Sequence, residues 1–492
     1  MTRHVCNVAA AAVLSAALVD AQAPAPGAGA QATKAEGTVY KNKAPVNKEI
    51  LRVSLPKPKE ADLSNGVHLI VLEDHRTPQV NFSMIIDGAG GYYDPPAVPG
   101  LAGFTASLMR EGTATKSSEQ ISEQLDRLAA SVSVGAGISS PSATVNGSGL
   151  TNNLDTVLAL MADVLMNPSF PQAEIDRYKT RSRAGLMQQR TQPGFLASER
   201  LNKAVFGDHP LARVSATPAA LDALTRDTLL EFHKTHYVPD RAVLAVTGDI
   251  TVEQAKAKAE AAFGAWKKSG AALPAQTEAA PLSGPTISLV VRPNSVQTSL
   301  RIGTQSIERK NPDFFALTVG NRILGGASGR LFEHLREQKG YTYGANSGFA
   351  SSRIPGSWTA STDVRSEVTD AALTDLIDEI RQMRETPVTE KELADAKRAI
   401  VGSFARLLES PDAILANYID QHFYQLSADY WDTYPAKIEA VTAADIQRVA
   451  KKYWTPERLQ IVAVGDLAKV EPALKKLGAV QIFDAEGKPI DK

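Results

Sequence analysis

The histidines are the first residues to consider for metal or acid–base chemistry. Of the eight in the chain, only His233 and His236 stand three positions apart on one predicted helix, where they could chelate a metal together. No acidic residue is suitably spaced to complete such a site. An amphipathic helix that enters the turn Tyr237–Asp240 explains the same pattern. Of the other six, His4 stands among the first residues, and five are scattered and expected on the surface or in the core; they are His68, His75, His209, His334 and His422.

Motifs for other kinds of catalysis are missing. The sequence contains no G-x-S-x-G turn for a serine nucleophile, and its single cysteine, Cys6, precedes the folded part. The glycine-rich run 325–329 lacks the G-K-[ST] ending of a phosphate-binding loop. Hydrolysis through serine or cysteine and nucleotide binding are therefore not predicted.

The first residues are typical of a secretory signal. Arg3 and His4 precede an apolar run from Val8 to Val19, and small residues follow at Ala21 and Ala23. We predict a cleavable signal peptide over residues 1–23, cut near Ala23, and a periplasmic or secreted protein. A retained membrane anchor is the alternative, although the run is short for one.

The overall composition indicates a folded protein without a strong charge preference. Lys and Arg total 53 and Asp and Glu total 54, which gives a net charge of −1. Hydrophobic residues make up 43% of the chain. The charge gives no reason to expect a nucleic-acid partner, and no later stretch is apolar enough for a transmembrane anchor.

Two segments far apart in the chain resemble each other. Residues 237–249 and 453–466 both run from an aromatic turn with proline and arginine through an apolar strand to Gly-Asp, and a similar helix precedes each. A duplicated domain explains this better than chance. The predicted organisation is a flexible tether at 24–46, an N-terminal domain at 47–268, a linker at 269–285 and a C-terminal domain at 286–492.

Short strands and amphipathic helices follow each other in blocks. We predict strands at 67–72 and 80–87, helices at 101–110 and 118–130, a hairpin of 131–136 with 143–148, and helices at 151–166 and 173–189. This order favours an α+β fold of two homologous domains. Each is expected to hold an antiparallel sheet with helices packed on one side, and the two to form a clamshell.

The segment Gly88–Thr113 resembles the insulinase (pitrilysin) peptidase family. Active members carry the inverted zinc motif H-x-x-E-H between the G-L-A and G-T that this segment also contains. One helical face then holds both histidines, and the glutamate polarises the bound water. The matching positions here are Gly103, Ala106 and Ser107, which form a degenerate zinc motif without imidazole or carboxylate.

The third zinc ligand of active members also has no counterpart. The resemblance places it in a stretch that here runs from Tyr178 to Gln189 without any acidic side chain and includes Arg181 and Arg183. Because all the ligands and the base are missing together, we predict no bound metal and no cofactor in this chain.

A second signature of the family is intact at 321–344. Members carry an Arg at the end of a helix and a Tyr seven residues later, and the matching residues are Arg336 and Tyr343. The resemblance implies that they contact the substrate near the scissile carbonyl, where both side chains can donate to an oxygen that gains negative charge. The alternative is that Arg336 merely pairs with a neighbouring Glu, such as Glu333, and that Tyr343 packs in the sheet. Tyr341 is expected to pack.

The resemblance also implies a peptide-binding edge strand. It corresponds to the segment Val132, Ser133, Val134, Gly135 and Ala136, whose small side chains would let a peptide add as a further strand. An ordinary sheet edge remains the alternative.

Some bacterial members of the family divide the work between two chains, one with the zinc and one with the Arg/Tyr pair. The present sequence is similar to the second kind. It is expected to be a non-zinc, substrate-binding subunit of a heteromeric metallopeptidase acting on peptides or unfolded polypeptides, inactive alone, with zinc in the partner subunit. The alternatives are a non-enzymatic scaffold or peptide-binding protein, and independent catalysis through an unrecognised site.

Overall fold

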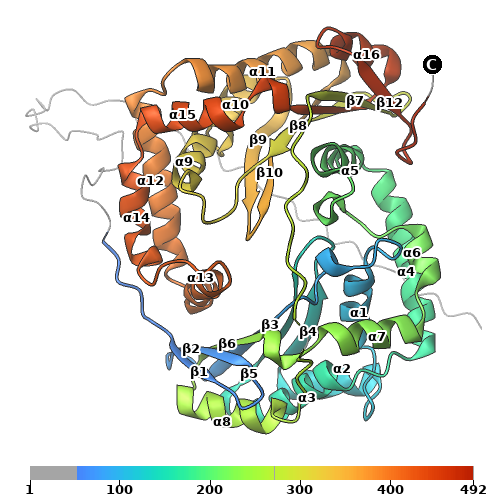
Figure 1. Ribbon diagram of the computed structural model, residues 1–492, viewed down its shortest axis with the longest axis vertical. Helices are drawn as coiled ribbons and strands as arrows, with labels where there is room; N and C mark the ends of the chain where they lie inside the picture. The colour runs from blue at the N-terminus through green and yellow to red at the C-terminus, as the bar shows by residue number, and fades with distance from the viewer. Residues whose placement is uncertain (1–51, 271, 491–492) are drawn as a thin grey trace, which may run out of the picture. The chain divides into compact units, whose positions relative to one another are not determined.

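The computed structural model describes residues 52–270 and 272–490 (Figure 1). The predicted signal, the tether and the first residues of the predicted N-terminal domain lie outside them. Within the described ranges, no helix combines the length and the apolar character that crossing a membrane requires.

The first half of the chain forms a six-stranded sheet. Its strands are β1 (Lys59–Asp62), β2 (His68–Glu73), β3 (Gln79–Asp87), β4 (Ser131–Ala136), β5 (Ser142–Leu150) and β6 (Ala242–Gly248). Their order across the sheet is β1-β2-β6-β3-β5-β4. All neighbours pair antiparallel except β2 and β6, because β6 returns after a long run of helices and inserts between β2 and β3. The predicted α+β class is confirmed, with one parallel pair in this otherwise antiparallel sheet.

The helices of the first half are α1 (Leu101–Met109), α2 (Ser118–Leu128), α3 (Leu154–Met166), α4 (Gln172–Arg190), α5 (Pro193–Phe206), α6 (Pro218–Ala223), α7 (Arg226–His236) and α8 (Val252–Phe263). Local sequence explains where α2 begins: Ser117 and Gln120 form a reciprocal capping box. Ile121 and Leu125 are buried on one stripe of this helix, so its amphipathic pattern is oriented as predicted.

The second half repeats this arrangement. Its strands are β7 (Thr286–Val291), β8 (Gln297–Gln305), β9 (Thr342–Ser351), β10 (Pro355–Arg365), β11 (Gln460–Gly465) and β12 (Val480–Phe483), in the order β12-β7-β11-β8-β10-β9. The five strands from β7 to β9 in this order match those from β2 to β4 in the first sheet. Here β11 and β12 both run parallel to β7, so this sheet is also mixed.

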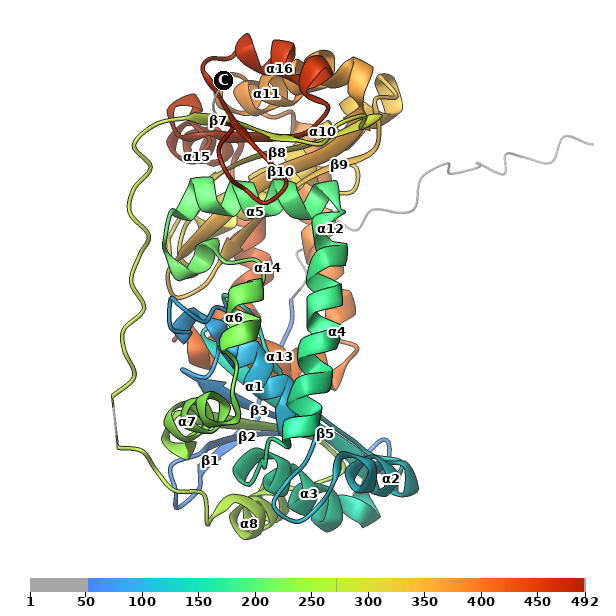
Figure 2. The same cartoon turned by 90° about the vertical axis from the view of Figure 1, so that its right-hand side faces the viewer.

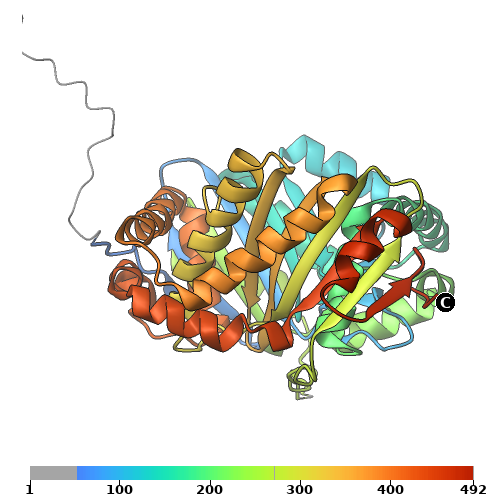
Figure 3. The ribbon, with the colours of Figure 1, turned by 90° about the horizontal axis from the view of Figure 1, so that it is seen from above.

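The helical segments of the second half are α9 (Phe314–Gly325), α10 (Arg330–Phe332), the π-helical turn η5 (Glu333–Gln338), α11 (Thr369–Glu385), α12 (Glu390–Leu407), α13 (Pro411–Phe423), α14 (Tyr430–Ala440), α15 (Ala443–Tyr453) and α16 (Leu467–Lys475). Figure 3 shows the orange helix α11 lying over the second sheet, roughly along its strands. Helices α7 and α15, the pair expected from the repeat, both begin at a threonine that forms a capping box.

Each half has its own main core between one face of its sheet and its helices. The opposite faces are also covered, which corrects the expectation of helices on one side only. Helix α5 of the first half packs its Leu201 and Val205 against Val462 and Val464 of β11. Figure 2 shows α5 lying beside the second sheet. In the reciprocal contact, α13 of the second half packs on β2 and β6 of the first sheet. Since α5 and α13 occupy equivalent places in the repeat, the two halves exchange one helix each.

Burial on both faces explains the apolar sequence of the central strands. Every residue of β11 is buried, and only the last residue of β6 is not. Strands covered on one face normally alternate between apolar and polar residues, whereas these two read as continuous apolar runs. The exchanged helices supply the second cover that such runs require.

Asp313, at the start of α9, provides a pH-dependent link between α9 and α15. Its carboxylate accepts hydrogen bonds from Arg448 at 2.7 Å, Lys452 at 3.0 Å and the Tyr453 hydroxyl at 2.7 Å. Burial acts to raise the pKa of Asp313, but the bonds from Tyr453, Arg448 and Lys452 outweigh it and hold the pKa at about 2. This lies below the value of an unfolded aspartate, so the stabilisation is present above about pH 4 and is lost as the pH falls toward 2.

We expect Asp313→Asn to lower the free energy of unfolding at pH 7, because it removes the charge that these three donors stabilise. The loss should be only about 2 kcal/mol, since Arg448 and Lys452 are half exposed and screened by solvent. Urea titrations at pH 7 and pH 3 should show that the difference from wild type shrinks at the lower pH. Asp370→Asn is the matched control, since its bond to Lys476 lies at the surface. An equal deficit at both pH values would contradict the assigned link.

Candidate functional site

The helix that carries the degenerate zinc motif is held by a buried carboxylate. Asp94 accepts hydrogen bonds from the backbone N–H groups of Gly100 at 2.6 Å and Ala102 at 2.8 Å, at the first turn of α1. Burial raises the pKa of Asp94 to about 6, against the opposing effect of these bonds. Gly100 has a φ of 98°, which favours glycine at this entry to the helix. The scaffold of the motif is therefore intact.

The three motif positions do not fit a zinc ion. Gly103 and Ser107 share one face of α1, while Ala106 is buried in the first half's core with 1% exposure. A Cβ built at Gly103 would lie 3.4 Å from the carbonyl oxygen of Ala136 on β4. Active members use two imidazole ligands and a carboxylate base at these positions, and a missing side chain, a methyl group and one neutral hydroxyl supply none of the three.

Aromatic and cationic groups of α4 stand beside the motif. The Tyr178 hydroxyl donates to Ser107 Oγ at 3.4 Å, and the Tyr178 ring meets Phe104 edge to face at 5.8 Å. The Arg181 guanidinium lies 5.6 Å from the Tyr178 ring centre, and Arg183 pairs with Asp222. The positive charge of the Arg181 guanidinium would repel a zinc ion at this position. Across residues 52–270 and 272–490, no group of three or more His, Cys, Asp or Glu side chains is placed to hold a metal ion.

The two helical histidines do not form a site together. His233 Nε2 bonds to the Leu165 carbonyl oxygen at 2.7 Å, and His236 Nδ1 bonds to the Gly88 carbonyl oxygen at 2.6 Å. Burial lowers the pKa of both imidazoles, which favours their neutral forms. They attach α7 to its neighbours, and α7 is the helix that enters the turn Tyr237–Asp240, as the amphipathic-helix interpretation has it.

Arg336 lies in the π-helical turn η5, a kind of irregular turn that is frequent at functional sites. Its side chain is 45% exposed, its guanidinium carbon lies 4.7 Å from the Phe332 ring centre, and its Nε is 3.6 Å from a Glu337 oxygen. Arg336 therefore does pair with a neighbouring glutamate, as the alternative expected, although the partner is Glu337 instead of Glu333. At 3.6 Å and in solvent this contact is weak, so the guanidinium keeps donors available for another acceptor.

Tyr343 is the most exposed large side chain on β9. It is 90% exposed, whereas Tyr341 two residues earlier packs against the core of the second half as expected. The alternative in which Tyr343 packs in the sheet is wrong. Because the ring lies in solvent, it adds little buried area to this fold, and its phenol is accessible to a molecule outside it.

The strand predicted to receive a peptide, β4, is the last strand of the first sheet. Val132 is buried and Val134 packs on the core, while Ser133 and Gly135 face outward. A Cβ built at Gly135 would meet no atom within 4 Å, and α1 packs against this strand. The backbone edge of β4 therefore lies next to the degenerate motif, with open space beside Gly135.

Comparisons with known proteins agree with this architecture. The model of the insulinase family (peptidase family M16) matches residues 69–219, and the model of the peptidase M16 inactive domain matches residues 223–400. The crystal structure of a peptidase M16 inactive domain from Pseudomonas fluorescens is 29% identical with a TM-score of 0.76, over 83% of this chain and 98% of that chain. A protease from Helicobacter pylori shares the fold, with 17% identity and a TM-score of 0.76, over 83% of this chain and all of that chain.

A curated relative also supports assignment to this family. An uncharacterized zinc protease of Bacillus subtilis, YmxG, is 26% identical over 72% of this chain and 85% of its own length. The duplicated α+β fold, with its Arg/Tyr segment in the second half, defines a two-domain peptidase-like protein. The chain belongs to the insulinase family, peptidase family M16.

Proposed function

We propose that this chain is the non-zinc, substrate-binding subunit of a heteromeric insulinase-type metallopeptidase that acts on peptides or unfolded polypeptides. One observation carries the proposal: Arg336 and Tyr343 are exposed and weakly engaged in a chain whose metal-binding positions hold no ligand. A family member that retains donors for the substrate but not the metal needs a second chain to complete the chemistry.

The two side chains suit one task in peptide hydrolysis. When water adds to a peptide carbonyl, negative charge develops on its oxygen, and a guanidinium and a phenol can both donate hydrogen bonds to it. The partner subunit's zinc would activate the attacking water. This chain would bind the peptide, orient it and stabilise the developing charge. The outward edge of β4 would add main-chain hydrogen bonds to an extended substrate.

Export is part of the proposal. The predicted signal at residues 1–23 would place the complex in the periplasm or outside the cell, where it would act on peptides and unfolded chains. Peptide affinity through β4 without partner-dependent cleavage would instead support the scaffold alternative.

Reconstitution tests the proposal. The purified chain and an insulinase-family chain that carries H-x-x-E-H, encoded in the same genome, are assayed separately and together on a fluorogenic unfolded peptide. We expect neither chain alone to match the mixture, and the two to co-elute in size-exclusion chromatography. A mixture no more active than the zinc-bearing chain alone, or the absence of a complex, would overturn the proposal.

A further inference from the structure

A β-bulge lies at Tyr343. Along the β9–β10 pair, Thr342 is opposite Val364 and Ala345 is opposite Thr362, so two residues of β9, Tyr343 and Gly344, face the single residue between them on β10. A bulge of this kind inserts one extra residue, breaks the alternation of the strand and re-aims a side chain.

The bulge decides where Tyr343 points. Ala345 is 3% exposed and belongs to the core of the second half. Regular alternation would place a residue two positions away on the same face, so Tyr343 would point toward the core helices. It is instead 90% exposed. The extra residue moves the ring from the covered face into solvent.

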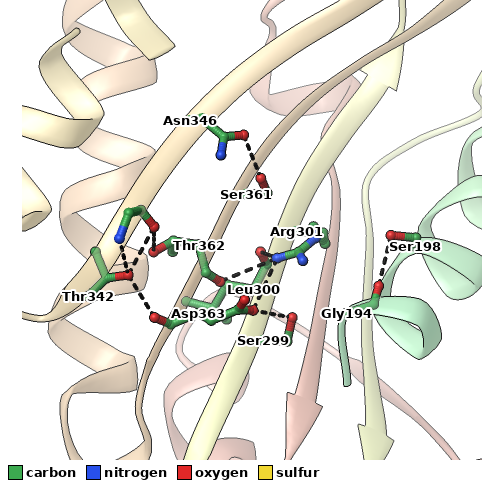
Figure 4. A network of polar contacts seen from close by, with 11 residues as sticks. Gly194, Ser198, Ser299, Leu300, Arg301, Thr342, Asn346, Ser361, Thr362 and Asp363 are labelled. Carbon is green, nitrogen blue, oxygen red and sulfur yellow. Dashed lines mark hydrogen bonds and ion pairs between the residues drawn. The ribbon is translucent and has the colours of Figure 1, made fainter. Parts of the chain in front are cut away.

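Hydroxyl groups on both strands hold the bulge in place (Figure 4). Thr342 Oγ1 accepts from the Gly344 N–H at 3.0 Å and lies 2.7 Å from the Asp363 carbonyl oxygen and 2.9 Å from the Gly344 carbonyl oxygen, to which it can donate. Thr362 Oγ1 donates to the same Gly344 carbonyl oxygen at 3.0 Å. The backbone of Gly344, which would otherwise pair regularly with β10, is thereby satisfied by side chains.

The residue opposite the bulge is fixed as well. The Asp363 carboxylate accepts from Ser299 Oγ at 2.5 Å and from Arg301 Nη1 at 3.4 Å. Arg301 Nη1 also donates to the carbonyl oxygen of Leu300 at 2.8 Å, which anchors the guanidinium on β8 (Figure 4). Three adjacent strands therefore hold the backbone around Tyr343.

We propose that Thr342 is a positioning residue that aims the Tyr343 phenol at the substrate by holding the β9 bulge, with Thr362 as its support. The inference rests on the proposed function, because it assumes that Tyr343 contacts substrate. Thr342 itself touches no substrate and acts only through Tyr343. Its hydroxyl replaces a ladder hydrogen bond, and without it the strand can slip back toward regular pairing and turn the ring away.

The test compares Thr342→Val, which keeps the shape and removes the hydroxyl, with Thr342→Ser, which keeps the hydroxyl. In the complex with the zinc-bearing chain, Thr342→Val should lower kcat about ten-fold with little change in KM, and Thr342→Ser should restore most of the rate. Thr359→Val is the matched control, at a half-buried position of β10 opposite Gly348 and away from the bulge. In a Tyr343→Phe background, Thr342→Val should have little further effect.

A second measurement does not depend on activity. Amide hydrogen exchange at Gly344, whose N–H is bonded to Thr342 Oγ1, should be faster in Thr342→Val and unchanged in Thr359→Val. If Tyr343→Phe lowers turnover while Thr342→Val changes neither kcat nor Gly344 exchange, the positioning inference is overturned and the proposed function stands. If Tyr343→Phe leaves turnover at the wild-type rate, the proposed function fails and this inference fails with it.

Discussion

Arg336→Ala and Tyr343→Phe are each expected to lower kcat of the reconstituted complex by about 10² to 10³. Removing a single donor to a developing oxyanion commonly has an effect of this size. The guanidinium is 45% exposed, and Tyr343 is almost fully exposed, so neither substitution removes a core contact of this chain. The melting temperature of the isolated subunit and its assembly with the partner should therefore be unchanged.

Matched controls separate the chemistry from the fold. Tyr341→Phe removes a hydroxyl two residues away on a ring that packs on the core, and Arg381→Ala removes an exposed guanidinium on α11. Both complexes should work near the wild-type rate in a steady-state assay on a fluorogenic peptide. Full turnover by the Arg336→Ala, Tyr343→Phe double variant in an intact complex would show that the assigned role is wrong.

Leu201→Ala is expected to lower the free energy of unfolding by about 2 to 5 kcal/mol, the range for a buried leucine whose removal leaves a cavity. Leu201 is 2% exposed and belongs to α5, the helix that the first half places on the second sheet. Its side chain fits against Gly303 of β8, where an added Cβ would come 3.0 Å from Leu201 Cδ2. The cavity would therefore open against the second sheet, although the substitution lies in the first half.

The location of the effect distinguishes helix exchange from simple destabilisation. Urea unfolding measures its size, and hydrogen exchange should show faster exchange in β8 and β11 for Leu201→Ala and in β2 and β6 for Leu415→Ala on α13. Leu407→Ala, at a position with 53% exposure on α12, should change stability by less than about 0.5 kcal/mol. Exchange changes confined to the half that carries each substitution would contradict the exchange of helices.

Much of the fold could be predicted because the local signals are strong. The repeat of the Tyr-to-Gly-Asp segments indicates two equivalent domains, and β6 and β11 end at Gly248 and Gly465 as that alignment requires. The helix exchange could not be read from periodicity, which shows which face of a helix is apolar but not which sheet covers it. The continuous apolar runs of β6 and β11 were the one signal that a second layer covers these strands, since strands buried on both faces lose their alternation.

The candidate site could be predicted only in part. The positions of Arg336 and Tyr343 follow from the signature around them, but alternation along β9 would have turned Tyr343 inward. The bulge that reverses this depends on hydrogen bonds of Thr342 and Thr362, two residues twenty positions apart that meet only in the folded sheet. A glycine inside a strand pattern, Gly344, was the one signal for the bulge in the sequence.

The metal content of the isolated chain decides whether it can act without a partner. Because the helix Leu101–Met109 carries no imidazole or carboxylate, we expect that the pure protein cannot activate water alone. Elemental analysis after dialysis against zinc, with a peptide-cleavage assay on the same sample, should give far less than one zinc ion per chain and no hydrolysis. One tightly bound zinc ion per chain with unaided peptide cleavage would contradict it.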